Sequence, residues 1–190
     1  AMGRSPEGIS FGKVTLEVMD GVGEKETKTA EFSDTNGHWA ESYLTDMAKI
    51  GAISGYSDGT MKPDNNIKVN EFIALVMQKM KYGGIKDGGA WDLGYINRAE
   101  ELGIVEDGEF DSFERSITRV EIARIVSRIS GRTGKSESAL PSDYDSVRED
   151  LKPYVAGVFG TGIMIGDDDG CFYPERNATR AEAAVILSKI

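Results

Sequence analysis

The segment Thr179-Arg180-Ala181-Glu182, together with the residues that follow it, decides the fold of this chain. Apolar side chains recur after the glutamate at helical spacing, namely Ala183, Ala184, Ile186, Leu187 and Ile190. A threonine three residues before a glutamate, ahead of an apolar run, is a capping box, in which each side chain binds the backbone N–H of the other residue. The segment therefore predicts the start of an amphipathic helix of about three turns.

The same segment occurs twice more along the chain. Thr118-Arg119-Val120-Glu121 precedes Ile122, Ile125, Val126 and Ile129. A weaker copy, Lys68-Val69-Asn70-Glu71, precedes Phe72, Ile73, Leu75, Val76 and Met77. Recurrence of one supersecondary pattern is the signature of a repeat architecture. We therefore expect three copies of one structural unit, the first of which has valine where the others have arginine.

A second helix is predicted ahead of each copy. Residues at steps of four mark it three times: Trp39, Tyr43, Met47 and Gly51; Trp91, Tyr95, Ala99 and Gly103; Asp150, Tyr154, Val158 and Gly162. A glycine just past the last periodic residue ends a helix at low cost, because it adopts positive φ freely. Polar loops with Asp-Gly turns, such as Asp58-Gly59, join the two helices. The fold class predicted is mainly α, built from three helix-loop-helix units.

The linkers and the boundaries of the repeats divide the chain into four parts. Residues 1–30 form an N-terminal lead-in, and residues 31–82, 86–132 and 140–190 form the three repeats. Within the lead-in, residues 13–19 alternate apolar and polar side chains, which predicts a short strand. Residues 83–89 and 131–139 are rich in glycine, serine or charge and are interpreted as linkers.

Composition argues against several classes of function. The formal net charge of -10 disfavours nucleic acid and anionic membranes as partners, and no apolar run approaches the roughly 20 residues that span a bilayer. Cys171, the only cysteine, forms neither an internal disulfide nor a thiolate metal site. His38, the only histidine, has no nucleophile at motif spacing. The aspartates at 167–169 are consecutive, whereas a calcium loop alternates its ligands. We expect no enzyme, cofactor or metal.

Capping does not explain the arginine inside the segment. A cation in the first helical turn opposes the helix macrodipole. A helix N-terminus with an added guanidinium is, however, a good anion site, and guanidinium pairs bidentately with carboxylates. A salt bridge to one of the 32 acidic residues is the alternative. Trp39 and Trp91 are explained either by core packing or by stacking on a sugar face.

The ordered set of motifs resembles the S-layer homology domain family. The first unit has Phe32-Ser33-Asp34, His38-Trp39-Ala40 and a Gly-Tyr-x-Asp-Gly-Thr loop, in the family's order. The second has Trp91, and the third has Asp143 and Lys152-Pro153-Tyr154. The resemblance covers about residues 31 to 190. It implies a pseudo-threefold helical unit whose inter-repeat grooves bind secondary cell wall polysaccharide, often ending in a pyruvylated N-acetylmannosamine.

The resemblance also implies a set of polysaccharide-binding residues: Arg119, Arg180, Asp34, Trp39, Trp91, Asp143, Asp58 and Gly59. The module would anchor an exported protein outside the cell, at the wall or S-layer of a Gram-positive type bacterium. Three departures predict that some grooves are disabled: Val69 at the arginine position, Asp150 at the tryptophan position and a short second loop. The alternative is a protein interaction or S-layer assembly module with degenerate sugar sites that self-associates.

Overall fold

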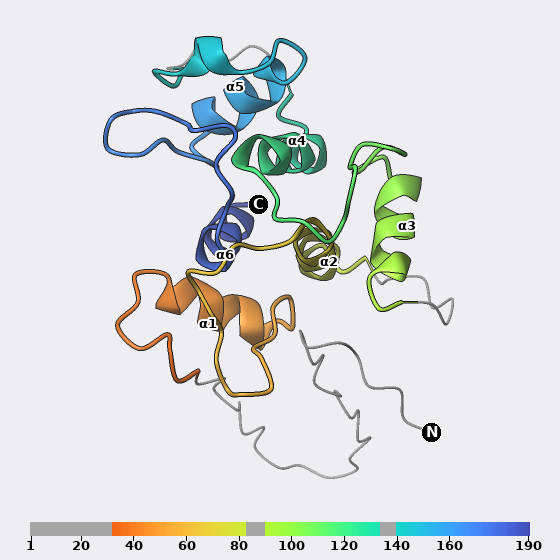
Figure 1. Cartoon of the computed structure of the whole chain (residues 1–190), viewed down its shortest axis with the longest axis vertical. Helices are drawn as coiled ribbons and strands as arrows, with labels where there is room; N and C mark the ends of the chain where they lie inside the picture. Colours follow the sequence, from red (N-terminus) through yellow and green to blue (C-terminus); the bar gives the residue numbers. More distant parts are fainter. Residues whose placement is uncertain (1–31, 83–89, 134–139) are drawn as a thin grey trace, which may run out of the picture.

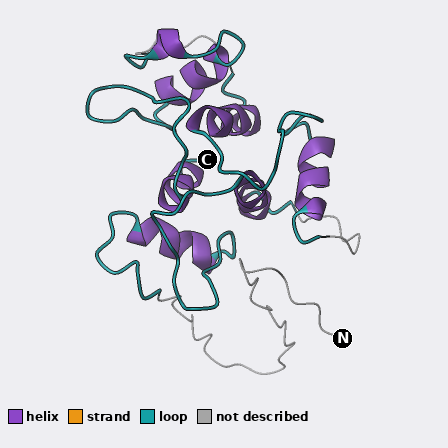
Figure 2. Cartoon of the chain, viewed as in Figure 1, coloured by secondary structure: helices purple, strands orange, loops and turns teal. Residues whose placement is uncertain are grey.

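The computed structural model describes residues 32–82, 90–133 and 140–190. Its helices are α1 (Glu41–Lys49), α2 (Val69–Lys79), α3 (Leu93–Glu101), α4 (Arg119–Ser130), α5 (Lys152–Gly160) and α6 (Arg180–Ser188), with a 3-10 turn at Tyr144–Ser146. The described residues contain isolated β-bridges but no strand (Figure 2). The mainly α prediction is therefore confirmed. The predicted strand at 13–19, the linker at 83–89 and most of the linker at 131–139 lie outside the described residues.

The central helices begin where the sequence predicts, whereas α1, α3 and α5 begin two residues after Trp39, Trp91 and Asp150, which were expected inside them. At α6, the Glu182 N–H donates to Thr179 Oγ1 at 3.2 Å and the Thr179 N–H donates to Glu182 Oε2 at 3.1 Å, which completes a capping box. Glu121 and Glu71 accept the equivalent backbone N–H groups at 2.9 and 3.1 Å. The glycines that follow α1, α3 and α5, namely Gly51, Gly103 and Gly162, have φ values of 73°, 67° and 70°. None of these helices is both long and apolar enough to cross a bilayer.

The helices α2, α4 and α6 meet at the centre of the molecule (Figure 1). The segments before them are joined by a closed triangle of backbone hydrogen bonds. Ile67 N–H donates to the Ala178 carbonyl at 3.0 Å, Ala178 N–H to Ile117 at 3.1 Å, and Ile117 N–H to Ile67 at 3.0 Å. Each residue stands at the same place before its helix, so this central triangle has the pseudo-threefold arrangement that the sequence predicts.

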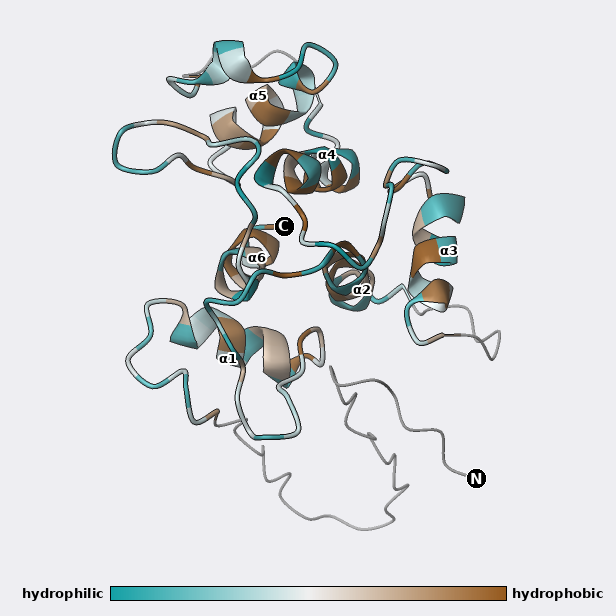
Figure 3. Ribbon diagram, viewed as in Figure 1, coloured by the Kyte–Doolittle hydropathy of each residue, from teal (hydrophilic) through white to brown (hydrophobic). Residues whose placement is uncertain are grey.

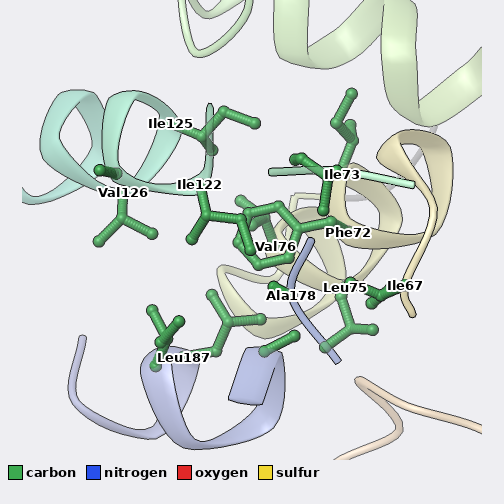
Figure 4. Close-up of a cluster of buried hydrophobic side chains, with 14 of the residues drawn as sticks. Ile67, Phe72, Ile73, Leu75, Val76, Ile122, Ile125, Val126, Ala178 and Leu187 are labelled. Atoms are coloured by element: carbon green, nitrogen blue, oxygen red, sulfur yellow. The ribbon is translucent and has the colours of Figure 1, made fainter. Parts of the chain in front are cut away.

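The hydrophobic core lies among the three central helices (Figure 4). Figure 4 shows side chains from α2, α4 and α6 converging there, including Phe72, Val76, Ile122, Val126 and Leu187. In Figure 3 the long loops between helices consist largely of hydrophilic or neutral residues, whereas the central helices include many hydrophobic residues. Full burial of each such side chain stabilises the fold by about 1.5–3 kcal/mol.

Each outer helix packs on a central helix that belongs to another helix pair. The helix α3 packs on α2, α5 packs on α4, and α1 packs on α6 (Figure 1). The first and last described helices therefore close the ring together. A groove between neighbouring pairs consequently combines side chains that are far apart in the sequence.

Candidate functional site

Two grooves with matching walls lie between neighbouring helix pairs. Groove A is lined by Trp39, Arg119, residues 163–167, Glu182, Val185, Ile186 and Lys189. Groove B is lined by Trp91, Arg180, residues 52–54, Glu71, Ala74, Leu75 and Gln78. Counted from the glutamate of the capping box, the same three positions (+3, +4 and +7) line both grooves. The fold thus builds one kind of surface twice from different parts of the chain.

A buried arginine lies at the base of each groove, with the same hydrogen bonds in both. Arg119 Nε donates to the Phe172 carbonyl and Nη2 to the Ile165 carbonyl, both at 2.7 Å. Arg180 Nε donates to the Met61 carbonyl and Nη2 to the Ser54 carbonyl, both at 2.9 Å. Each guanidinium therefore joins, by hydrogen bonds, the first turn of a helix in one pair to the loop of another pair.

The remaining end of each guanidinium faces the glutamate of the groove. Arg119 Nη1 lies 3.8 Å from Glu182 Oε1, and Arg180 Nη1 lies 3.9 Å from Glu71 Oε2. Both arginines are almost fully buried, with exposed fractions of 5% and 2%. Burial lowers the pKa of Arg119, which Glu182 partly offsets. The salt-bridge interpretation of the sequence thus holds in part, and the Nη1 end is the part of the cation left for a ligand.

The helix N-termini themselves are not open to an anion, which corrects one sequence-based expectation. The first two N–H groups of α6 donate to the Asn65 and Pro63 carbonyls, both at 2.9 Å. The equivalent groups of α4 donate to Arg176 and Pro174 at the same distance. Because loop carbonyls already satisfy these donors, the positive charge at the base of each groove comes from the arginine side chain and not from the helix N-terminus.

The tryptophans stand at the edges of the grooves rather than in the core. Trp39 is 61% exposed and lines groove A, and Trp91 is 38% exposed and lines groove B. Of the two explanations that the sequence left open for these rings, core packing is therefore wrong. An exposed indole beside a groove offers a flat apolar surface of the kind that stacks on a ring.

The two grooves differ in size and in charge. Groove A encloses about 180 Å³ and groove B about 20 Å³. Groove A also has a second cation close by, because Arg176 Nη2 lies 2.8 Å from Glu182 Oε1. With Arg119 and Lys189, these residues give groove A the more positive surroundings. Groove A is therefore better suited than groove B to an acidic ligand.

Asp34 and Asp143 hold loops in place and line neither groove. Asp34 accepts the N–H groups of Met61 and Lys62 at 2.7 and 2.8 Å. Asp143 accepts those of Phe172 and Tyr173, both at 2.7 Å. Lys62 and Tyr173 have positive φ values of 51° and 55°, which side-chain-bearing residues seldom adopt. The carboxylates stabilise this turn, and a role for them as ligand contacts stays a prediction.

Replacing Asp143 with asparagine tests the loop role. An amide has one acceptor oxygen, so one of the two backbone N–H groups loses its partner, at a cost of about 1–3 kcal/mol of unfolding free energy. Urea denaturation followed by circular dichroism measures the loss. Asp145→Asn, on the adjacent 3-10 turn, is the matched control and is expected to change little. Equal stability of the two variants would contradict the loop role.

Asp58 and Gly59 form a turn that also lies outside both groove linings. Asp58 Oδ1 accepts the Thr60 N–H at 3.0 Å and the Thr60 hydroxyl at 2.6 Å. These hydrogen bonds lower the pKa of Asp58. Of the predicted residues, the structure therefore brings together Arg119 with Trp39 and Arg180 with Trp91.

Sequence reasoning missed the walls of the grooves. Val185, Ile186 and Lys189 line groove A at regular steps after Glu182, and Ile165 lines it from the loop. Their signal in the sequence was their helical register, which places them on one face beside the glutamate. Among the residues that the structure describes, no three histidine, cysteine, aspartate or glutamate side chains gather as a metal site would require.

Comparison with known proteins agrees with this architecture. The model of the S-layer homology domain matches residues 31–68 and 144–184. An amylopullulanase of Thermoanaerobacterium thermosulfurigenes is 29% identical over 82% of this chain and 9% of its own length. An S-layer protein of Bacillus licheniformis is 27% identical over 80% of the chain and 18% of its own length. A cellulosome-anchoring protein of Acetivibrio thermocellus is 33% identical over 38% of the chain and 17% of its own length.

The chain thus spans less than a fifth of each of these relatives. The amylopullulanase and the S-layer protein each match it over a small part of their length, so the likeness concerns a segment common to proteins with different names. Three observations indicate the same family: the two matched segments, the helical fold and the motifs around each groove. The chain belongs to the S-layer homology domain family.

Proposed function

We propose that this chain anchors the protein that contains it to a bacterial cell surface by binding an acidic wall polysaccharide. Groove A is the main site, and groove B is a smaller second site. We include in the proposal the division into three repeats at residues 31–82, 86–132 and 140–190. The single observation that supports it best is the twofold occurrence of one arrangement, an exposed tryptophan beside a groove with a buried arginine.

The size and chemistry of groove A favour one sugar ring with a negative group. Its volume of about 180 Å³ is below the roughly 300–1,000 Å³ of sites for drug-sized ligands. The apolar walls from Val185 and Ile186 suit the face of a sugar ring, and Trp39 offers a stacking surface. A carboxylate at the end of the ring would reach Arg119 Nη1 and Lys189, both of which donate hydrogen bonds to carboxylates well.

The expected ligand is secondary cell wall polysaccharide, with a pyruvylated N-acetylmannosamine terminus as its acidic group. The relatives support an anchoring task, because their names include a cellulosome-anchoring protein and an S-layer protein. The amylopullulanase matches this chain over only 9% of its own length, which suits a module without chemistry of its own. We propose a location outside the cell, at the wall or S-layer of a Gram-positive type bacterium.

Binding to purified wall sacculi tests the proposal. The chain is incubated with sacculi before and after acid extraction of the secondary polysaccharide, and the bound fraction is measured after sedimentation. We expect binding to untreated sacculi and its loss after extraction. Soluble extracted polysaccharide should compete. Equal binding to both preparations would show that peptidoglycan or another component is the partner, and the polysaccharide proposal would then be wrong.

A second candidate function is assembly with further protein copies. Large apolar side chains are exposed around groove A and just after α1, including Trp39, Ile165 and Ile50. Exposed apolar side chains of this kind favour association when they form a continuous patch. Analytical ultracentrifugation over a hundredfold range of protein concentration distinguishes the two functions. Oligomers in a chain that ignores polysaccharide would favour assembly.

A further inference from the structure

The pseudo-threefold fold has a third position equivalent to grooves A and B, which we name position C. The residues that correspond to the groove linings are Val69, residues 104–106, Glu121, Arg124, Ile125, Arg128 and Asp150. Two substitutions remove the ligand-facing groups: Val69 replaces the buried arginine and Asp150 replaces the tryptophan. Two others add bulk: Arg124 stands where groove A has Val185 and also adds charge, and Arg128 stands where groove A has another cation, Lys189.

The two added arginines enclose a carboxylate of the same chain. Glu109 Oε2 accepts a hydrogen bond from Arg128 Nη1 at 2.5 Å, and Oε1 lies 2.5 Å from Arg124 Nε. The contact with Arg124 is an ion pair whose angle is not that of a hydrogen bond, since neither of its atoms has a hydrogen-bond partner. The Glu109 side chain is only 2% exposed. Position C therefore holds a buried anion between two cations.

Arg128 lies along the wall of position C. Its Nη1 also donates to the Ile104 carbonyl at 3.1 Å, and its Nη2 donates to Glu106 at 2.9 Å. The guanidinium carbon lies 5.7 Å from the centre of the Tyr154 ring. Residues 104–106 are the counterparts of 163–165, which form the open wall of groove A. The side chain of Arg128 thus covers the surface that a ligand meets in the other two grooves.

We propose that position C is an anion-binding site whose occupant is the chain's own Glu109 carboxylate. The internal carboxylate takes the place that an acidic ligand has in groove A, so position C is closed to ligands from outside. This confines polysaccharide binding to grooves A and B, a consequence that rests on the proposed function. The anion site itself does not rest on it, because it follows from the contacts of Glu109 with Arg124, Arg128 and the backbone N–H of Glu106, which donates to Oε2 at 2.7 Å.

Chemical rescue with a small carboxylate tests the site directly. Glu109→Ala removes the carboxylate and leaves space beside two partly buried arginines that have lost their shared partner, so we expect the melting temperature (Tm) to fall by about 6–20 °C. Sodium acetate should then fill the space. If it binds with a Kd of about 10 mM, 100 mM acetate raises the Tm of this variant by about 3–6 °C above sodium chloride of equal ionic strength.

Two control variants make the rescue specific. Glu109→Gln keeps the volume of the side chain, which leaves no room for acetate, so it should lose stability without rescue. Glu106→Ala removes the exposed partner of Arg128 and should show little loss and no acetate effect. If Glu109→Ala is unfolded in chloride, recovery of helical circular dichroism on acetate titration is the measurement. Identical responses to acetate and chloride would overturn the proposal.

The number of polysaccharide sites is the second readout, and it uses the unaltered chain. Isothermal titration with size-fractionated fragments of secondary wall polysaccharide should give at most two sites per chain. Three sites of similar affinity would overturn the closure of position C. If no fragment binds, the proposed function has failed, while acetate rescue of Glu109→Ala still decides whether the internal anion site exists.

Discussion

Replacing Arg180 with alanine is expected to lower the free energy of unfolding by about 3–5 kcal/mol, the usual cost of removing one partner from a buried charged contact. The guanidinium is 2% exposed and binds the carbonyls of Met61 and Ser54. Without it, both carbonyls lose their partner, Glu71 loses its nearest cation, and a cavity remains. Urea denaturation followed by circular dichroism measures the loss.

Two further variants show whether the loss comes from this site. Arg98→Ala removes an exposed arginine that pairs with Glu101 on α3, and it should change stability by less than about 0.5 kcal/mol. Arg180→Lys keeps the positive charge but cannot bind both carbonyls with one planar group, so an intermediate loss is expected. A stability of Arg180→Ala within about 1 kcal/mol of the original chain would contradict the structural role of this arginine.

This result would also change how the arginine motif is tested for ligand binding. From the sequence alone, a capping box explains the threonine and the glutamate, and the arginine between them is assigned either to a ligand or to a salt bridge. In the structure the same side chain joins two helix pairs. Loss of binding in Arg180→Ala would therefore have two causes that cannot be separated. The ligand would lose a contact, and the wall of groove B would move because Arg180 no longer binds the Ser54 carbonyl.

Much of the fold could be predicted because its signals are local. The capping box at Thr179 and Glu182 and the positive φ of Gly51 involve residues within a few positions of one another. The helical spacing of apolar residues is also a local signal, and it predicts which side chains face the core. The pseudo-threefold arrangement was available only through the resemblance, since the triangle of Ile67, Ile117 and Ala178 joins segments more than 40 residues apart.

The candidate site was predicted less completely because it depends on which helices are neighbours. The packing of α1 on α6 brings Trp39 beside Arg119, and no pattern in either segment specifies that pairing. The tryptophan spacing also suits a core position, so exposure could not be inferred from it. The closure of position C needs Glu109 from a loop and two arginines from α4. The sequence shows the helical spacing of the two arginines, but it does not show that Glu109 lies between them.

Trp39→Ala is expected to weaken polysaccharide binding in groove A by about 30-fold, the effect of losing an interface tryptophan worth about 2 kcal/mol. Because the indole is 61% exposed, its removal should change the free energy of unfolding by less than about 1 kcal/mol. Binding and stability are therefore separable here, as they are not at Arg180. Isothermal titration with soluble polysaccharide fragments measures the affinity, and thermal denaturation measures the stability.

Ile50→Ala is the matched control for Trp39→Ala, because it removes another exposed apolar side chain just after α1 that lines neither groove. It should leave the affinity unchanged. Trp39→Phe should retain part of the affinity, since a smaller ring still stacks on a sugar face. On whole sacculi the loss in Trp39→Ala should not exceed that seen with single fragments, because groove B still holds the chain to the same surface there. If Trp39→Ala binds fragments as the original chain does, groove A is not the site, and the same comparison at Trp91 then decides whether groove B is.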